Sequence, residues 1–232
     1  MNAEAQKRAA AERAVALVED GMKLGLGTGS TARHVLQVIA ERRRNGELSG
    51  IVGVPTSRAT EQLAMALGIP LTTLDETPHL DLAIDGADEV DPGLNLIKGL
   101  GGALLWEKIV ASAADRFVIV CDESKLVKQL GEKAPVPVEV VPFAHRSHMS
   151  FFEKLGAAPR LREENDRAFV TDSGHYIIDC YFANGLNDPW QFEAELRQRP
   201  GIVETGLFLG MAQTVVVASP EGVNVMARGK DA

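Results

Sequence analysis

Hydrophobic residues in the first half of the chain alternate between short apolar runs and stretches with helical spacing. Residues 22–26 and 51–55 are apolar runs typical of buried strands, and residues 32–44 carry Val35, Leu36 and Ile39 at helical spacing. The same patterns predict further helices at 3–19, 57–67 and 103–114, and further strands at 71–74, 82–85 and 117–121. Alternating strands and helices predict an α/β fold, with a mostly parallel sheet covered by helices on both faces.

The pattern changes after Gly131, where prolines interrupt an apolar stretch. Helices are expected at 147–155 and 188–198, a hairpin over 168–181 that turns at Asp172-Ser173-Gly174, and a strand at 202–205. This predicts a small α+β unit of the ferredoxin-like kind, inserted at 132–206. Residues 1–131 and 207–232 then form a larger, Rossmann-like domain, to which the tail contributes a hairpin built from 214–218 and 223–227.

The composition is that of an ordinary globular protein. The chain has 232 residues, 45% of them hydrophobic and 24% charged, which is enough to bury a core without disulfides or metals. The net charge of -8 argues against nucleic-acid binding, and the one basic cluster, residues 42–44, ends a predicted helix, where cations complement the helix dipole. Cys121 and Cys180 form no metal-type or CxxC spacing and are expected to be small buried residues.

No apolar stretch approaches the length of a membrane span, and the first residues do not resemble a signal peptide. We therefore expect no membrane partner and a cytoplasmic location. The pair His145 and His148 lacks a third ligand with suitable spacing, so no metal site is expected. Trp190 and Phe192 are expected to anchor a core or an interface.

A glycine- and hydroxyl-rich loop, Gly27-Thr28-Gly29-Ser30-Thr31, lies between a predicted strand and a predicted helix. Free backbone N–H groups and the helix dipole favour an anion there, and the hydroxyls of Thr28, Ser30 and Thr31 add donors. The simpler interpretation is a helix cap next to a tight turn. Because the GK[ST] ending of a P-loop is absent, the loop suits the phosphate of a small molecule better than a nucleotide.

A dinucleotide-binding function is an alternative, since Gly27 to Ala32 satisfies a loose G-x-G-x-x-A pattern. However, the next strand ends at Val54-Pro55-Thr56 without the acidic residue that would hold a ribose hydroxyl. This absence argues against an NAD-dependent oxidoreductase.

Acidic residues and glycines gather between Asp85 and Glu107. The string Asp85-Gly86-Ala87-Asp88-Glu89 follows a predicted strand, so its carboxylates are expected at the carboxyl edge of the sheet, where α/β proteins bind ligands. Lys98-Gly99-Leu100-Gly101-Gly102 comes next, and Glu107 lies in the first turns of a helix. Each feature alone also fits a turn or a helix cap. Together they supply a base, a cation near an oxyanion and further acids, which are the parts that an enolisation needs.

The chain resembles the ribose-5-phosphate isomerase A family. The resemblance is carried by the strings at 28–31, 85–89, 96–99, 107–109, 135–140, 170–174 and 200–208, in order along nearly the whole chain. It implies a metal- and cofactor-free isomerase of ribose 5-phosphate and ribulose 5-phosphate, with a sugar phosphate as partner and a homodimer or larger homo-oligomer as assembly. It also supports the return of the tail to the larger domain.

The resemblance also implies residue roles. Glu107 matches the base that moves a proton between C1 and C2, Asp85 a residue that opens the furanose ring, and Asp88 one that handles protons on the sugar oxygens. Lys98 matches a cation near the enediolate oxygens, and Lys125 and Lys7 match positions that hold the sugar or its phosphate, although solvated lysines are an equally simple interpretation of these two. The implied substrate-binding residues are Thr28, Gly29, Ser30, Thr31, Asp85, Gly86, Ala87, Asp88, Lys98, Gly99, Leu100, Gly101, Lys125 and Lys7.

Two positions depart from the family pattern. Leu100 interrupts a run of glycines, so either its backbone is ordinary or the loop is reshaped, because leucine adopts positive φ poorly. Trp106 replaces the more usual arginine beside the base. The main rival function is a non-catalytic sugar-phosphate sensor. A sensor needs a DNA-binding module, and the roughly twenty residues before the first strand are too few for one.

Overall fold

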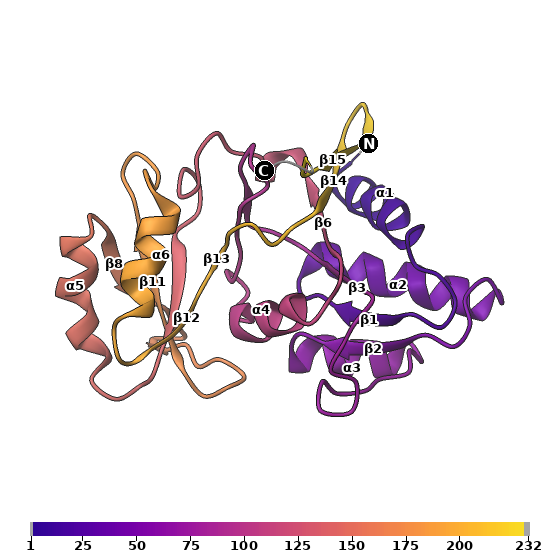
Figure 1. Ribbon diagram of the computed structural model, residues 1–232, viewed down its shortest axis with the longest axis horizontal. Helices are drawn as coiled ribbons and strands as arrows, with labels where there is room; N and C mark the ends of the chain where they lie inside the picture. Colours follow the sequence, from indigo (N-terminus) through magenta and orange to yellow (C-terminus); the bar gives the residue numbers. More distant parts are fainter. Residues whose placement is uncertain (1, 230–232) are drawn as a thin grey trace. The chain divides into compact units, whose positions relative to one another are not determined.

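The computed structural model describes residues 2–229, and the chain divides into two compact units (Figure 1). The large unit comprises Met1–Ala87, Trp106–Lys125 and Gly210–Ala232, and the small unit comprises Asp88–Leu105 and Leu126–Leu209. In the part of the chain that is described, no helix is both long and apolar enough to cross a membrane.

A six-stranded sheet forms the centre of the large unit, with the order β15-β14-β6-β3-β1-β2. Neighbouring strands run parallel except for β14 and β15, which form the predicted tail hairpin, and β14 pairs with β6. The strands are β1 (Lys23–Leu26), β2 (Val52–Pro55), β3 (Leu82–Asp85), β6 (Phe117–Asp122), β14 (Thr214–Ser219) and β15 (Gly222–Ala227). Strands β1, β3 and β6 are almost wholly buried, which explains their continuous apolar runs.

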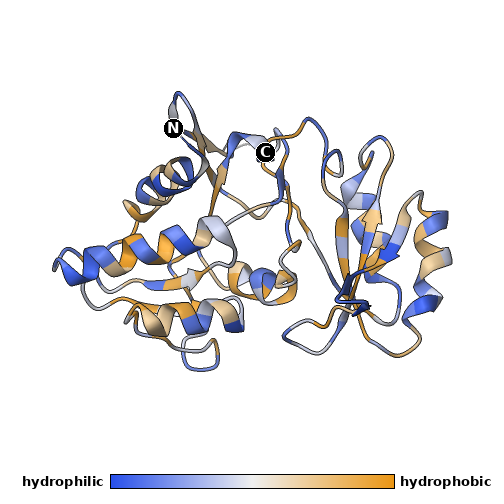
Figure 2. Cartoon of the chain, turned by 180° about the vertical axis from the view of Figure 1, so that it is seen from behind, coloured by the Kyte–Doolittle hydropathy of each residue, from blue (hydrophilic) through white to orange (hydrophobic). Residues whose placement is uncertain are grey.

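Helices cover both faces of this sheet, as the alternating pattern predicted (Figure 1). They are α1 (Ala3–Val15), α2 (Ser30–Arg44), α3 (Arg58–Ala66) and α4 (Leu104–Ser112), the last belonging to the large unit from Trp106 onward. The alanine-rich sequence of α1 has a packing reason, because Ala10, Ala11 and Ala14 are fully buried and let α1 approach α2 closely. In Figure 2 these helices carry both orange and blue residues, as amphipathic helices do.

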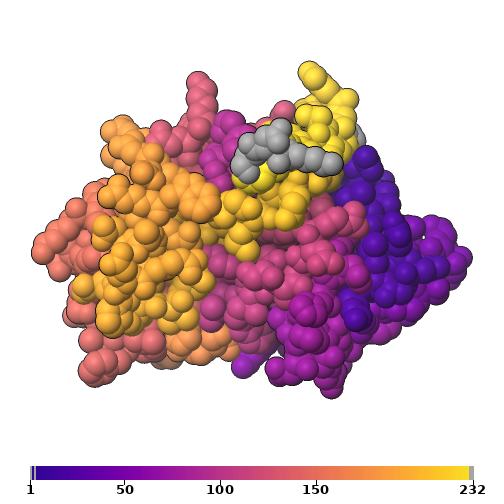
Figure 3. Space-filling view, viewed as in Figure 1, coloured from indigo at the N-terminus to yellow at the C-terminus, as the bar shows by residue number. Residues whose placement is uncertain are grey.

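The C-terminal hairpin also packs on α1, which contacts both β14 and β15. In Figure 3 the yellow surface of the hairpin adjoins the indigo surface of the first helix. The two ends of the described chain therefore meet on the large unit, at the edge of the sheet that β15 forms.

The small unit has a four-stranded antiparallel sheet with the order β12-β7-β11-β8. Its elements are β7 (Val136–Val140), α5 (Met149–Lys154), β8 (Ala158–Leu161), β11 (Tyr176–Tyr181), α6 (Pro189–Arg197) and β12 (Ile202–Thr205). This succession and order are those of a ferredoxin-like unit, which confirms the predicted fold class. Val136, Val138, Ile178 and Cys180 belong to its core together with Phe152 of α5 and other residues of the helices.

A second, three-stranded sheet in the small unit carries part of the predicted site. It consists of β4 (Glu89–Val90), β5 (Leu96–Ile97) and β13 (Leu207–Phe208), with β5 in the middle. Lys98 directly follows β5, and its N–H donates to the carbonyl of Gly206 at 2.9 Å. Strands β4 and β13 both pair antiparallel with β5, and they thus fix the backbone that leads into the glycine-rich segment.

Two sequence predictions of secondary structure are wrong. Residues 71–74 form no strand: Leu71 makes a single bridge with Gly53, and the hydroxyl of Thr73 then accepts the N–H of Glu76 in a turn. The stretch before Asp172-Ser173-Gly174 does not pair with β11. Instead β10 (Arg167–Ala168) pairs with β9 (Glu163–Glu164), while β11 pairs with β7 and β8.

Of the two aromatic residues expected as anchors, only one lies in the core. Phe192 is 4% exposed and packs edge-on against Phe182, with ring centroids 5.2 Å apart. Trp190 is 56% exposed. Both lie on α6, and their spacing of two residues places them on different sides of the helix.

Candidate functional site

The strand order of the large unit creates a topological switch point between β1 and β3. The chain leaves β1 towards β2 on one side, and it then crosses to β3 on the other side. Open α/β sheets bind ligands outside the carboxyl ends of the strands at such a point. The glycine loop follows β1 and Asp85 ends β3, so the sheet brings these two predicted features to neighbouring strand ends.

Hydrogen bonds join the glycine loop to Asp85. The N–H groups of Thr28 and Gly86 donate to Asp85 Oδ1 at 3.0 and 2.7 Å, and the N–H of Gly27 donates to the carbonyl of Ile84. A Cβ atom on Gly27 would lie 2.2 Å from Asp85 Oδ1 and 2.6 Å from its Cα. Only glycine permits this approach, and the carboxylate, 2% exposed, is consequently held in one orientation.

The Thr28 side chain belongs to a cluster of hydroxyl groups that the sequence analysis missed. Thr28 Oγ1 lies 2.7 Å from Thr56 Oγ1, 2.9 Å from Ser57 Oγ and 3.0 Å from Thr60 Oγ1. Thr60 Oγ1 in turn donates to the carbonyl of Gly27 at 3.0 Å. The Thr28 hydroxyl, expected to be a donor for an anion, is thus engaged in locking the loop to the end of β2. The signal in the sequence was three hydroxyl residues within five positions after that strand.

Backbone N–H groups at the start of α2 remain the donors best placed for an anion. Gly29 caps the helix with φ +106°, a conformation that favours glycine, and Gly29 and Ser30 are exposed while Thr31 is half-buried. The helix is 15 residues long, and its first turn contains no acidic side chain that would compete with a bound anion.

Glu107 is 5% exposed, in the first turn of α4. Val110, on the same helix face, packs against the sheet: a Cβ on Gly25 would lie 2.7 Å from both Val110 Cγ1 and Ala83 Cβ. Because α4 leads into β6, which runs parallel to β3, the helix starts near the carboxyl ends of the strands. Its first turn, with Glu107, therefore lies towards the edge at which Asp85 ends β3.

The two predicted substrate lysines of the large unit differ in their surroundings. Lys7 of α1 donates to Glu4 at 3.0 Å, and Glu4 also contacts His34 Nε2 of α2 at 3.1 Å; these two partners, Lys7 first, lower the pKa of Glu4. Through Glu4, Lys7 is therefore linked to His34, which lies one turn after the N-terminus of α2. Lys125 is half-buried and ends a short 3-10 helix, Glu123–Lys125, directly after β6.

The remaining predicted residues belong to the small unit. Asp88 and Leu100 meet, since the N–H of Leu100 donates to Asp88 Oδ2 at 2.9 Å. Lys98 is 2% exposed, and its Nζ lies 5.5 Å from the centroid of the Phe208 ring. Positive φ angles in this segment fall on Gly99, at +101°, and on Gly102, at +82°. Leu100 therefore takes an ordinary backbone conformation, which decides between the two alternatives left by the sequence.

Glu89, the last residue of the acidic string, has a structural role. Its side chain is fully buried and accepts hydrogen bonds from three backbone N–H groups, those of Gly131, Lys133 and Ala134. The carboxylate thus fixes the segment that leads into β7. Only Asp85 and Asp88 of this string remain candidates for chemistry.

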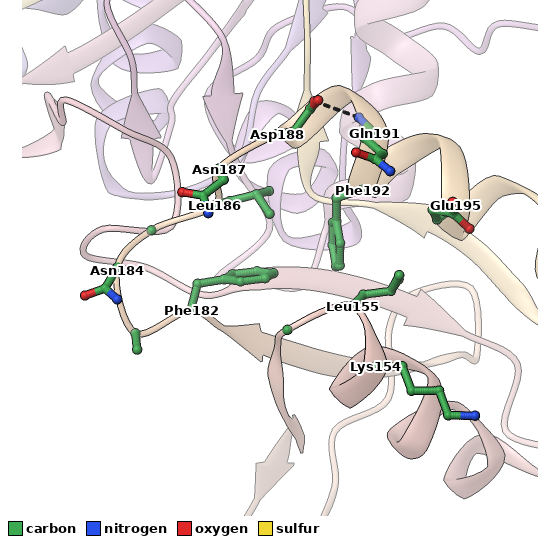
Figure 4. Close-up of a pocket in the computed structure, with 13 residues that line it drawn as sticks. Lys154, Leu155, Phe182, Asn184, Leu186, Asn187, Asp188, Gln191, Phe192 and Glu195 are labelled. Atoms are coloured by element: carbon green, nitrogen blue, oxygen red, sulfur yellow. Dashed lines mark hydrogen bonds between the residues drawn. The ribbon is translucent and has the colours of Figure 1, made fainter.

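A separate pocket of about 410 Å³ lies in the small unit (Figure 4). The ring of Phe182 is part of its lining, and the carboxylate of Asp188 caps α6 by accepting the N–H of Gln191 at 2.9 Å. The polar side chains of Asn184 and Glu195 lie at opposite sides of the group of lining residues and do not converge on one point. None of the predicted site residues lines this pocket.

Cys121, Cys180 and His148 are buried side chains with structural surroundings. Cys121 and Cys180 are each 2% exposed or less, as predicted, and burial raises the pKa of the Cys121 thiol to about 12. His148 Nδ1 accepts from Arg199 Nε at 3.0 Å, and burial lowers the pKa of this ring. Among residues 2–229 no three histidine, cysteine or acidic side chains gather in a way that would hold a metal ion.

Comparison with known proteins gives consistent results for both units. Residues 52–222 match the family described as ribose 5-phosphate isomerase A (phosphoriboisomerase A). The chain is 53% identical to ribose-5-phosphate isomerase A of Roseiflexus sp. (strain RS-1), over 94% of this chain and 93% of that protein. It is 52% identical to the protein of the same name from Gloeobacter violaceus, over 97% of both chains.

Solved structures agree with the sequence comparisons. A D-ribose-5-phosphate isomerase in complex with phospho-erythronic acid is 43% identical, covers 98% of this chain and 100% of its own, and superposes with a TM-score of 0.95. The ribose 5-phosphate isomerase of Plasmodium falciparum is 37% identical, with 97% and 98% coverage and a TM-score of 0.94.

Proposed function

Because the chain belongs to the ribose 5-phosphate isomerase A family, we propose that it interconverts D-ribose 5-phosphate and D-ribulose 5-phosphate in the non-oxidative branch of the pentose phosphate pathway. The observation that carries this conclusion is similarity to isomerases of one name over at least 94% of the chain. A sugar-sensing function is not favoured, since the match covers 93% and 97% of relatives named as isomerases and the chain has all four groups assigned to the chemistry.

The central step is a proton transfer between adjacent carbons. In the open-chain aldose the Glu107 carboxylate takes the proton from C2, the electron pair of that C–H bond forms the C1=C2 bond of an enediolate, and the same proton returns to C1. A proton moves from O2 to O1, so the reaction is redox-neutral. Burial in the first turn of α4 suits Glu107 to this role, because a carboxylate removed from water is a stronger base.

Three further side chains serve the steps around this transfer. Asp85 assists opening of the furanose ring, and its fixed orientation at the end of β3 supports that role. Asp88 handles the protons on the sugar oxygens. Lys98 offsets the negative charge of the enediolate, and its burial strengthens that electrostatic effect. Like the roles below, these assignments rest on the family resemblance.

The phosphate is assigned to the loop of residues 28–31 at the start of α2, where N–H groups and the helix dipole favour an anion. Lys7 and Lys125 add positive charge, and Gly86, Ala87 and residues 99–101 add backbone contacts to the sugar. The phospho-erythronic acid bound by a relative fits this scheme, because it joins a phosphate to a planar carboxylate that resembles an enediolate in shape and charge.

The proposal includes no metal or organic cofactor, since a carboxylate base and a buried cation suffice for the proton transfer. We also propose a cytoplasmic homodimer or larger homo-oligomer, and a catalytic domain of residues 1–131 and 207–232 with a smaller domain at 132–206.

Conversion of ribose 5-phosphate in the presence of EDTA tests the function. Turnover is expected to survive chelation, and its loss would contradict the metal-free mechanism. Glu107→Gln removes the base while keeping the side-chain shape, so kcat is expected to fall by about 10²- to 10⁴-fold or more. Glu61→Gln is the matched control, because Glu61 is exposed in the first turn of α3, a helix as long as α4. Near-normal activity of Glu107→Gln would refute the assignment.

A further inference from the structure

Arg162 makes an ion pair with Asp179 in the small unit. Asp179 lies in β11, one of the two central strands of the four-stranded sheet, and Arg162 directly follows the edge strand β8. Arg162 Nε donates to Asp179 Oδ2 at 2.9 Å and Nη2 donates to Oδ1, so that two parallel bonds fix the plane of the guanidinium. The two side chains are only 13% and 11% exposed.

The backbone of Arg162 is held as firmly as its side chain. Its N–H donates to the carbonyl of Ile177 at 2.8 Å, and its carbonyl accepts the N–H of Phe169 at 2.9 Å. The Phe169 ring lies 5.8 Å from the guanidinium carbon, within the range of a cation–π contact. The same ring adjoins Gly102, where a Cβ would come within 2.4 Å of Phe169 Cζ. Arg162 is therefore a rigid group next to the segment that follows Lys98.

The part of the Arg162 guanidinium that does not contact Asp179 binds the segment that follows Lys98. Arg162 Nη1 donates to the carbonyl oxygens of Gly99 and Leu100, at 2.8 and 3.0 Å. The Gly99 carbonyl also accepts the N–H of Gly102 at 3.0 Å, which closes the turn. An ion pair that served only the sheet would not need these two contacts. They fix the directions of two consecutive peptide groups.

The first of these peptide groups connects Arg162 to Asp88. The carbonyl of Gly99 and the N–H of Leu100 belong to one trans peptide, in which they point in opposite directions. The carbonyl accepts from Arg162, while the N–H donates to Asp88 Oδ2 at 2.9 Å. A continuous series of hydrogen bonds thus runs from Asp179 through Arg162 and this peptide to Asp88. A cation on the carbonyl side polarises the peptide and makes its N–H a stronger donor.

We infer that Arg162 is a positioning residue of the isomerase: by holding the Gly99–Leu100 peptide, it orients Asp88 and the backbone that follows Lys98. The inference rests on the proposed function, in which Asp88 and Lys98 take part in the reaction. Arg162 acts through the peptide and has no assigned contact with the substrate. Arginine is needed because its planar fork binds Asp179 with one edge and two carbonyls with another, which the single ammonium of lysine does not reproduce.

The experiment compares Arg162→Met with Arg160→Met. Arg160 is a matched control, because it lies opposite Asp179 in the sheet register, yet it is exposed and its guanidinium rests 4.8 Å from the ring centroid of Tyr181. Isomerase kinetics and hydrogen–deuterium exchange of the Leu100 amide are measured on both variants and on the parent. Arg162→Lys tests whether positive charge alone restores the effect.

In Arg162→Met we expect kcat to fall by about 10- to 100-fold and KM to rise by a smaller factor, because the phosphate contacts of residues 28–31 are kept while the reacting groups and the sugar contacts of residues 99–101 are misplaced. The Leu100 amide is expected to exchange at least about 10-fold faster than in the parent, which corresponds to the weakening of one hydrogen bond. Arg162→Lys is expected to recover only part of kcat, and Arg160→Met to match the parent in both measurements.

A folded Arg162→Met protein with kcat within about 2-fold of the parent, or with unchanged exchange at Leu100, would overturn the inference. If that variant does not fold, Asp179→Asn gives the same comparison, since it removes the charge of the anchor and keeps its shape. An inactive parent would overturn the proposed function, whereas the exchange comparison would still decide whether Arg162 holds the Gly99–Leu100 peptide.

Discussion

Replacing Glu89 by glutamine separates the structural carboxylate of the acidic string from its neighbours assigned to chemistry. Glu89 is fully buried, and the N–H groups of Gly131 and Ala134 donate to its two oxygens at 2.6 Å each, while the N–H of Lys133 shares one of them. All partners are donors, so the site requires an acceptor on both side-chain atoms. Glutamine offers one acceptor and turns a donor towards at least one N–H.

The expected cost follows from these three bonds. In the better amide orientation, the oxygen keeps two N–H partners but loses its charge, which weakens each bond by about 1 kcal/mol. The third N–H faces an NH₂ group, and an unsatisfied buried donor costs about 1–3 kcal/mol. The total is about 3–5 kcal/mol, or a melting temperature about 6–20 °C lower for a chain of this size.

The assay is thermal unfolding followed by circular dichroism, together with isomerase activity below the melting transition. Glu89→Gln is expected to lose stability and to keep most of its kcat, because Glu89 contacts backbone N–H groups and not the reacting atoms. Glu107→Gln is expected to show the reverse, lost kcat with a melting temperature near that of the parent. A melting temperature within about 2 °C of the parent for Glu89→Gln would refute the hydrogen-bond reasoning.

Three further predictions concern other parts of the large and small units. Gly27→Ala is expected to lower kcat by about 10²-fold or more, because its Cβ would displace the Asp85 carboxylate; near-normal kinetics would contradict this. Cys121 and Cys180 are expected to resist a disulfide reagent in the folded protein and to react in guanidinium chloride, since burial raises both thiol pKa values; rapid labelling of the folded protein would contradict this. Burial raises the pKa of Glu139 above its ordinary value of 4.5. Between pH 4.5 and the raised pKa, this carboxyl group ionises more readily in the unfolded chain than in the folded protein, so the folded protein loses stability as the pH rises. The melting temperature of Glu139→Gln minus that of the parent should therefore increase with pH over this interval. A difference that does not change with pH would refute the raised pKa of Glu139.

Local patterns in the sequence were sufficient for most elements of the fold. The strands at 82–85 and 202–205 were predicted with their observed bounds, because each begins with apolar residues and ends in a polar one. The failures have a common cause. Leu71 lies in a strand-like sequence but forms only one bridge, to Gly53 of β2. Strand β11 pairs with β7 and β8 and not with the segment directly before it. Pairing over such distances is not encoded in a local pattern.

The sequence predicted the candidate site about as completely as it predicted the fold. A glycine loop after a strand and carboxylates after another strand indicated an anion site and acid–base chemistry, and the family resemblance supplied individual roles. The sequence placed Glu89 with Asp85 and Asp88, although its buried carboxylate holds three N–H groups. It missed the hydroxyl cluster around Thr28 and the contacts of Arg162, since an arginine 60 residues after a loop carries no local signal.

The sequence by itself determined the α/β class, the anion loop, the carboxylates and the family, because each depends on residue type and short spacing. Only the tertiary structure decided which of these side chains serve mainly to hold the fold together. That decision depends on hydrogen-bond partners: Glu89 and the Thr28 hydroxyl meet donors and acceptors from distant segments, and Arg162 reaches Gly99 and Leu100 across more than sixty positions of chain. Such partners exist only once the strands have paired, so no local pattern contains them.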